Sequence, residues 1–348
     1  MPFPMFRTSP WILAAIIWLA GAVGADVIVV DLLRGSDVQE GTAELPLRTL
    51  QRAAGMVNAR TEPGPTTIRL LPGIYALERS VTFENRRAYG RDRPLAIEAS
   101  IAPGTPGWTP DSMPAIVSIE DPRKPGGRGP TQTYGLKVKM GHVAIRGLKF
   151  LGSPLLDNWY CPLECLADDL TDVRVTGCLF AAAPGIQEIY CAVITDGHRF
   201  TVDHCVFLGC RACAVFWDGG RGVEGRGNAM HHCIVDGARI AGVWTCDTGE
   251  DFEFHHNVVA RSEYFWMRKR GATRTYAVRD CLLVGNRNRS GYGVESGPTG
   301  PSGPEVTFLE EALIEEGPAD IEMNPRFPNY LKVRPGTPGA SLGAGLSE

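Results

Sequence analysis

The chain has 348 residues, a formal net charge of −4 and a mean hydropathy of −0.08. This balance supplies no strong positive field, so we expect no nucleic-acid partner. The 41 glycines and 26 prolines indicate many turns, which favours a β-rich fold over a helical one.

The first residues have the pattern of an export signal. Arg7 precedes an apolar run over residues 11–23, and Val23 and Ala25 are small residues that suit a cleavage site. The run is too short for a comfortable membrane span. We therefore predict a signal peptide over residues 1–25. The remainder, residues 26–348, is expected to be one secreted, monomeric domain without a membrane span.

An internal repeat predicts the architecture. Six segments share an alternating apolar pattern and start 24 to 30 residues apart, within a region, 142–297, where the repeats are clearest. Such units are too short for a βαβ crossover, so we expect stacked coils of parallel strands with loops of variable length. The six segments are residues 145–150, 175–180, 202–207, 230–235, 254–259 and 278–283.

The fourth position of each repeat predicts an inward ladder at a bend, because equivalent residues of stacked coils lie above one another. The ladder consists of Leu148, Cys178, Cys205, Cys233, Asn257 and Cys281. We expect its four cysteines to be buried thiols that pack as small apolar side chains, with disulfides between neighbouring coils as the alternative.

This pattern resembles the right-handed parallel β-helix (pectin-lyase-like) superfamily, in which asparagine often fills the bend. The resemblance covers nearly all of residues 26–345. It implies an all-β, single-stranded right-handed parallel β-helix with a short capping helix near its N-terminus, here over residues 50–59. We also expect a long loop over residues 92–127 and a short helical piece around residues 308–316.

A second repeat indicates where chemistry could lie. Residues 191–197 recur as 213–219, and the alignment continues through 241–247, 265–270 and 293–297. In this alignment Phe216, Trp244 and Trp266 form one column, and the residues two positions later form a column on the same face. If that face points outward, aromatic rings lie beside charged groups in a sugar-binding trench. If it points inward, the aromatic rings form part of the core.

The outward interpretation favours a polysaccharide lyase that cleaves an acidic, uronate-containing extracellular polysaccharide by β-elimination. Arg268 and Lys269 would act as base and charge neutraliser, since cationic neighbours lower the pKa of a base. The expected metal ligands, for Ca²⁺, are Asp196, Asp218 and Asp247. The expected substrate-binding residues are Phe216, Trp217, Trp244, Trp266, Arg270 and Glu295.

Two alternatives use the same surface differently. Asp196 and Asp218 could act as the paired carboxylates of a glycoside hydrolase. A non-catalytic protein that binds glycans or belongs to a cell-surface layer would need only the aromatic rings.

Histidines form two further columns beside the bend. The first contains His204, His232 and His256, followed by Asp280, and the second contains Asp203, His231, His255 and Arg279. Structural stacking is the leading interpretation, and metal binding or catalysis are the alternatives.

Overall fold

The computed structural model describes residues 26–121, 131–155, 158–217, 225–246, 249, 251–269, 275–294, 297–298, 309–314, 319–327 and 329–346. The predicted signal peptide over residues 1–25 lies outside them. No helix among the described residues is long and apolar enough to cross a bilayer.

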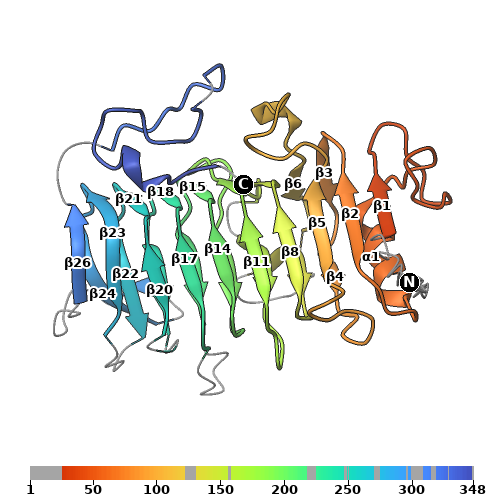
Figure 1. The fold of residues 1–348 in the computed structure, drawn as a ribbon, viewed down its shortest axis with the longest axis horizontal. Coiled ribbons are helices and arrows are strands. Elements are labelled where there is room, and N and C mark those ends of the chain that lie inside the picture. Colours follow the sequence, from red (N-terminus) through yellow and green to blue (C-terminus); the bar gives the residue numbers. More distant parts are fainter. Residues whose placement is uncertain are drawn as a thin grey trace, which may run out of the picture.

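The chain is a parallel β-helix with a 17-stranded and a 9-stranded sheet. The larger sheet turns through a bend, and we call its two parts the first and second sheets and the 9-stranded one the third sheet (Figure 1). The first sheet runs the full length of the coil, and each of its strands pairs in parallel with the strand one coil away. Its strands are β1 (Asp26–Val30), β2 (Thr66–Leu70), β5 (Leu95–Ala99), β8 (Val143–Arg146), β11 (Val173–Thr176), β14 (Thr201–Asp203), β17 (Ala229–His231), β20 (Glu253–His255), β23 (Ala277–Val284) and β26 (Leu309–Ile314).

The second sheet follows the first after a sharp bend and joins it through β23, which pairs in both. Its other strands are β3 (Ile74–Leu77), β6 (Ala115–Ser118), β9 (Lys149–Leu151), β12 (Leu179–Ala181), β15 (Val206–Leu208), β18 (Ile234–Asp236) and β21 (Val258–Ala260). The third sheet consists of β4 (Val81–Phe83), β7 (Thr131–Val138), β10 (Asn158–Cys165), β13 (Cys191–Thr195), β16 (Ala212–Phe216), β19 (Ala241–Thr245), β22 (Tyr264–Lys269), β24 (Asn288–Val294) and the antiparallel β25 (Gly297–Pro298).

The strand register beside the bend between the first and second sheets confirms the predicted alignment of the first repeat. Val175 pairs with Ile145 and with Val202, and Val202 pairs with Met230. All six ladder side chains are fully buried, and the cysteines are free thiols. Asn257 accepts a hydrogen bond from the Cys233 amide and donates one to the Met230 carbonyl, at 2.9 Å each.

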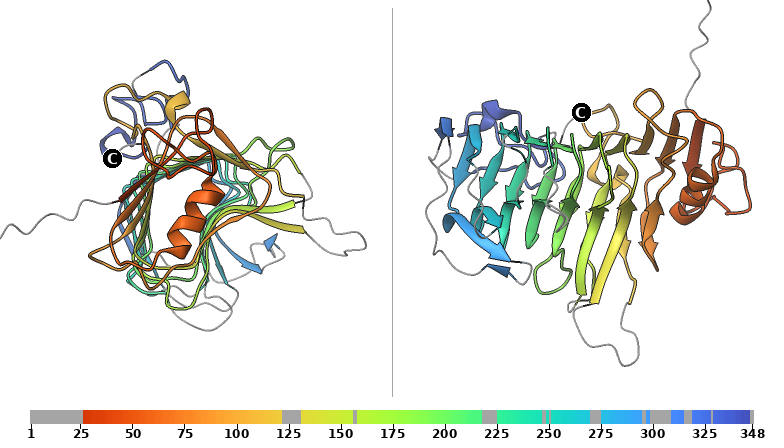
Figure 2. Two further views of the ribbon diagram at one scale, coloured as in Figure 1. Left: turned by 90° about the vertical axis from the view of Figure 1, so that its right-hand side faces the viewer. Right: turned by 90° about the horizontal axis from the view of Figure 1, so that it is seen from below.

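The core fills the inside of the coil with stacked side chains. The rings of Phe150, Phe180 and Phe207 lie parallel with centroids 4.8 Å apart, one coil spacing, so each coil buries apolar area against the next. The helix α1 (Leu50–Ala59) covers the open N-terminal end of the coil, as predicted (Figure 2). Thr49 caps it by accepting a hydrogen bond from the Arg52 amide.

Two expectations about connections are wrong. Residues 92–127 contain β5 and β6, because Leu95 and Ile97 alternate with polar residues and bury their side chains in the coil. The expected helical piece near residue 310 is instead β26, whose backbone pairs with β23 and so extends the first sheet by one strand.

The C-terminal segment packs on the outside of the second sheet. Leu331, Leu342 and Leu346 are buried against an apolar outer row that contains Val206 and Ile234. This segment therefore covers the outer face of the second sheet and leaves the third sheet without such a cover from it.

Candidate functional site

The third sheet does not follow simple alternation of inward and outward side chains. In β16, Ala212 and Val215 belong to an outer apolar cluster, whereas Cys213 and Ala214 both point into the core. The neighbouring strand β19 has the same irregularity. Ala212 pairs with Ala241 and Ala214 pairs with Val243, and the register skips the residue between them. The strands β13, β16, β19 and β22 therefore switch face parity after their second residue.

Because of this switch, the aromatic residues of the predicted column do not all lie on one face of the sheet. Phe216 pairs with Thr245 and Trp266 pairs with Val243, and both aromatic side chains lie in the core with 1% and 0% exposure. The Trp266 indole N–H donates to Thr245 Oγ1 at 2.9 Å. The prediction that Phe216 and Trp266 form an outward sugar platform is therefore wrong, whereas Trp244 does belong to the outer cluster.

Arg268 is also on the inward side. It pairs in register with Thr245, lies two residues after the inward Trp266, and is 5% exposed. Its guanidinium donates to the Tyr292 hydroxyl at 2.8 Å. Lys269 is exposed but does not line the pocket described below. The predicted presentation of Arg268 to an outer groove is wrong, because the parity switch turns it inward.

Four predicted site residues, Asp218, Asp247, Arg270 and Glu295, lie outside the described residues. Of the three expected calcium ligands, only Asp196 is therefore placed. No three or more His, Cys, Asp or Glu side chains converge on one point that could hold a metal ion in the described parts of the chain.

The outer face of the third sheet carries a pocket of about 220 Å³, which we call the outer pocket. Its floor is hollow because small side chains occupy it: Cys161, Cys191 and Ala212. Aromatic residues surround this floor on strands of five successive coils. The lining residues are Gln132, Tyr134, Trp159, Cys161, Leu166, Tyr190, Cys191, Ile194, Ala212, Val215, Trp217 and Trp244.

Aromatic contacts fix the walls of the outer pocket. Trp159 meets Tyr190 edge to face, with centroids 4.6 Å apart, and the Arg211 guanidinium lies 4.5 Å from the Tyr190 centroid. The indole nitrogens of Trp159 and Trp244 are buried and have no hydrogen-bond acceptor among the described residues. Buried polar groups are usually paired, so these two donors are unusual, and a ligand would reach them only after a neighbouring side chain moves.

Two carboxylates stand on the same outer face beside the outer pocket. Glu164 on β10 is 7% exposed, pairs in register with Ile194, and has Oε2 3.3 Å from Lys137 Nζ. Asp196 follows β13, next to the pocket residues Ile194 and Trp217. One coil and two residues separate them, which corresponds to about 8 Å between their Cα atoms.

The two carboxylates have different electrostatic surroundings. Burial raises the pKa of Asp196, and the nearby charge of Glu164 raises it further, although the Ala167 amide donates to Asp196 at 3.1 Å. Lys137 places a positive charge against Glu164 and also lies 4.2 Å from the Tyr134 centroid. Burial raises the pKa of Tyr134 and of Tyr190, so both hydroxyls stay protonated at neutral pH.

Sequence reasoning missed Glu164, Tyr134, Trp159 and Tyr190 and found Asp196, Trp217 and Trp244. The sequence does contain a signal for β10, the strand that carries Trp159 and Glu164. The coil needs a third-sheet strand between the repeats at 145–150 and 175–180, and the aromatic segment Asn158–Cys165 lies there.

No family model matches the chain, and no curated protein matches it. Solved structures that resemble it include a native GH136 lacto-N-biosidase from Eubacterium ramulus, at 10% identity and a TM-score of 0.46, over 76% of this chain and 51% of that chain. Another is a rhamnogalacturonan lyase, at 12% identity and a TM-score of 0.45, over 77% of this chain and 70% of that chain. The chain thus spans about half the length of the first of these, and similarity at this level concerns the backbone path alone.

Proposed function

We propose that this protein binds a carbohydrate in the outer pocket and hydrolyses a glycosidic bond there. The observation that carries the proposal is the aromatic pocket itself, with the carboxylates of Glu164 and Asp196 at its side. Aromatic faces pack against the C–H faces of sugar rings, while the polar groups bond to hydroxyls.

Asp196 and Glu164 would have different catalytic roles. A carboxyl group with a raised pKa holds its proton closer to neutral pH, which suits a general acid, so Asp196 would protonate the leaving oxygen. Glu164, whose Oε2 lies 3.3 Å from Lys137 Nζ, would act as the base or nucleophile. Glycosidases hold their two carboxyl groups about 5 to 9.5 Å apart, and the Cα atoms of Asp196 and Glu164 lie about 8 Å apart on the same face.

The lyase predicted from the sequence is the second candidate. Its proposed base, Arg268, is buried on the inward side, which removes support for β-elimination at that position. Lys137 and Arg211 still provide cations near the outer pocket, and these could neutralise a uronate carboxylate. Calcium and export from the cell remain proposals.

The test is an assay of the full chain against a panel of neutral and acidic oligosaccharides. Hydrolysis predicts new reducing ends without the ultraviolet absorbance of unsaturated uronates, whereas β-elimination produces that absorbance. Glu164→Gln and Asp196→Asn should each lower the rate by about 10²- to 10⁴-fold while leaving binding intact. Glu98→Gln is the matched control, because Glu98 pairs with Arg69 on the first sheet, away from the outer pocket.

Binding without either product would reduce the proposal to a carbohydrate-binding protein. Absence of binding to every glycan, or equal activity of the wild type and both carboxylate variants, would contradict it.

A further inference from the structure

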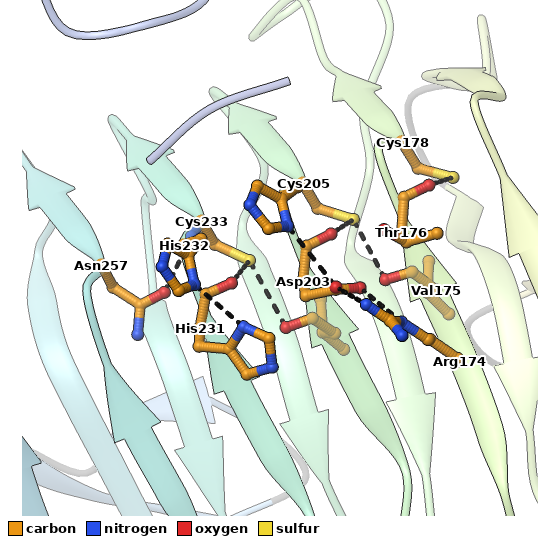
Figure 3. Close-up of polar contacts among 12 residues, drawn as sticks. Arg174, Val175, Thr176, Cys178, Asp203, Cys205, His231, His232, Cys233 and Asn257 are labelled. Carbon is orange, nitrogen blue, oxygen red and sulfur yellow. Dashed lines mark hydrogen bonds and ion pairs between the residues drawn. The ribbon is translucent and has the colours of Figure 1, made fainter. Parts of the chain in front are cut away.

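Five of the seven histidines gather at the bend between the first and second sheets, whereas the outer pocket lies on the third. Figure 3 shows two of them, His231 and His232, at this bend. We call this cluster the histidine ladder; it consists of His204, His231, His232, His255 and His256. One column stacks His204, His232 and His256 with ring centroids 4.8 Å apart. The other stacks His231 on His255 at 5.0 Å with nearly parallel rings.

Two coils each contribute a pair of adjacent imidazoles whose nitrogens face one another. Nδ1 of His231 lies 3.1 Å from Nδ1 of His232, and the corresponding distance between His255 and His256 is 3.0 Å. The second member of each pair has a left-handed backbone, with φ of 54° in both, and the two rings of each pair stand almost perpendicular. We call each pair a rung.

We propose that the histidine ladder binds a divalent transition-metal ion, which one rung chelates through its two Nδ1 atoms. Metal–imidazole bonds of about 2.0 to 2.1 Å and the observed separations give a nitrogen–metal–nitrogen angle of about 95°. That angle suits a tetragonal or octahedral ion whose other positions are filled by water. Imidazole is a preferred ligand of Cu²⁺, Ni²⁺ and Zn²⁺ but not of Ca²⁺ or Mg²⁺.

The protonation state of the rungs favours this binding. Burial and the neighbouring imidazoles lower the pKa of His232 to about 4, and burial also lowers the pKa of His231 and of His255. His231, His232 and His255 are therefore neutral near pH 7 and retain nitrogen lone pairs. In the metal-free rung one Nδ1 carries the shared proton. Chelation moves that proton to Nε2 of the same ring, so no net proton is released.

The ends of the histidine ladder differ from its centre. At the coil before the first rung, Asp203 is fully buried and forms an ion pair with Arg174, and its Oδ2 lies 3.4 Å from His204 Nδ1 (Figure 3). Arg174 therefore competes with any ion for that carboxylate. Each rung instead brings two Nδ1 atoms within 3.1 Å of each other, so we take the rungs as the chelating positions.

We expect one ion per chain. Two divalent ions on neighbouring rungs would lie about one strand spacing apart, and their mutual repulsion opposes double occupancy. The order of affinities should follow the general series for divalent ions, with Cu²⁺ bound more tightly than Zn²⁺.

The experiment is a Cu²⁺ titration of the full chain near neutral pH, followed by calorimetry and by electron paramagnetic resonance. The expected result is one Cu²⁺ per chain with hyperfine coupling to two imidazole nitrogens, weaker binding of Zn²⁺ and none of Ca²⁺. The double variant His231→Gln/His255→Gln leaves one imidazole in each rung and should weaken Cu²⁺ binding at least tenfold.

The matched control is His142→Gln/His198→Gln, which removes the two histidines outside the histidine ladder and should bind Cu²⁺ like the wild type. If the first double variant unfolds, His232→Asn/His256→Asn tests the same claim, because asparagine tolerates the left-handed conformation. Equal Cu²⁺ affinity of the wild type and the folded ladder variant, or equal loss in the control, would overturn the proposal. Glycan binding is measured in parallel and is expected to be unchanged, so failure of one proposal does not imply failure of the other.

Discussion

Trp244 and Trp266 lie on neighbouring strands of the third sheet, yet their indole rings are on opposite sides of it. Trp266 pairs in register with Val243 and is fully buried in the core, whereas Trp244 belongs to the outer cluster and lines the outer pocket. We therefore expect Trp266 to contribute to the stability of the sheet and Trp244 to contribute to ligand binding.

Alanine substitutions at these two tryptophans should have different effects. Trp266→Ala removes a fully buried side chain and its bond to Thr245, so we expect a loss of about 3 to 5 kcal/mol in the free energy of unfolding. Trp244→Ala should cost less stability, because the outer pocket beside it opens to solvent, and should abolish glycan binding. Urea unfolding and a binding titration measure both effects. Loss of binding in Trp266→Ala at a temperature where it is fully folded would contradict the assignment of Trp266 to the core alone.

Asp196→Asn should stabilise the protein at neutral pH. The pKa of Asp196 is raised in the folded state above its ordinary value of 3.8, mainly by burial, so the folded protein holds this proton more tightly than the unfolded chain. Stability contributed by the protonated form is therefore lost as pH rises from about 3.8 through the folded-state pKa. Asparagine carries no charge and can still accept from the Ala167 amide. The gain in unfolding free energy should be present at pH 7 and vanish near pH 3.5, and a gain independent of pH would rule out the electrostatic explanation.

The histidine ladder should make the metal-free protein less stable in mild acid. The pKa of His232 falls from 6.5 to about 4 on folding, because burial and the neighbouring imidazoles oppose its charge. Between these two pH values the unfolded chain binds more protons than the folded protein, so stability decreases as pH falls from 6.5 towards 4. Chemical unfolding at several pH values measures this decrease, and His232→Asn should reduce it. An unchanged pH dependence in that variant would exclude His232 as a source.

Asn257→Ala should destabilise the coil even though only a small side chain is lost. The substitution leaves the buried Cys233 amide and the Met230 carbonyl without their side-chain partner, which costs about 2 to 4 kcal/mol. Asn324→Ala, in an exposed part of the C-terminal segment, is the control and should cost less than about 1 kcal/mol. Similar unfolding midpoints for the two variants would show that the amide does not stabilise the bend.

The first sheet and its bend could be predicted from the sequence, whereas the third sheet could not. Around the bend, the buried positions of Val202, Cys205 and Phe207 recur at equivalent places in the neighbouring coils, and the observed register matches that alignment. In the third sheet the likeness of residues 191–197 to 213–219 aligns Cys191 with Cys213, but Cys191 actually pairs with Ala212. A shift of one residue exchanges the two faces of a strand, so Phe216 and Trp266 were expected on the wrong side.

The sequence predicted only part of the candidate site. Trp217 and Trp244 were expected at an outer surface and do line the outer pocket, while Glu164 and Trp159 come from β10, which the repeat alignment did not include. The parity switch within β13, β16, β19 and β22 has no signature in composition or periodicity. It depends on how the strand curves around the core, which is a tertiary property.

The central claim, that the outer pocket is the carbohydrate site, is tested most directly by a crystal structure of the Glu164→Gln variant with an oligosaccharide that the assay shows to bind. We predict sugar density against the rings of Trp159, Tyr190, Trp217 and Trp244. Density confined to another surface, such as the polar hollow between Arg69 and Arg146 on the first sheet, would contradict the claim.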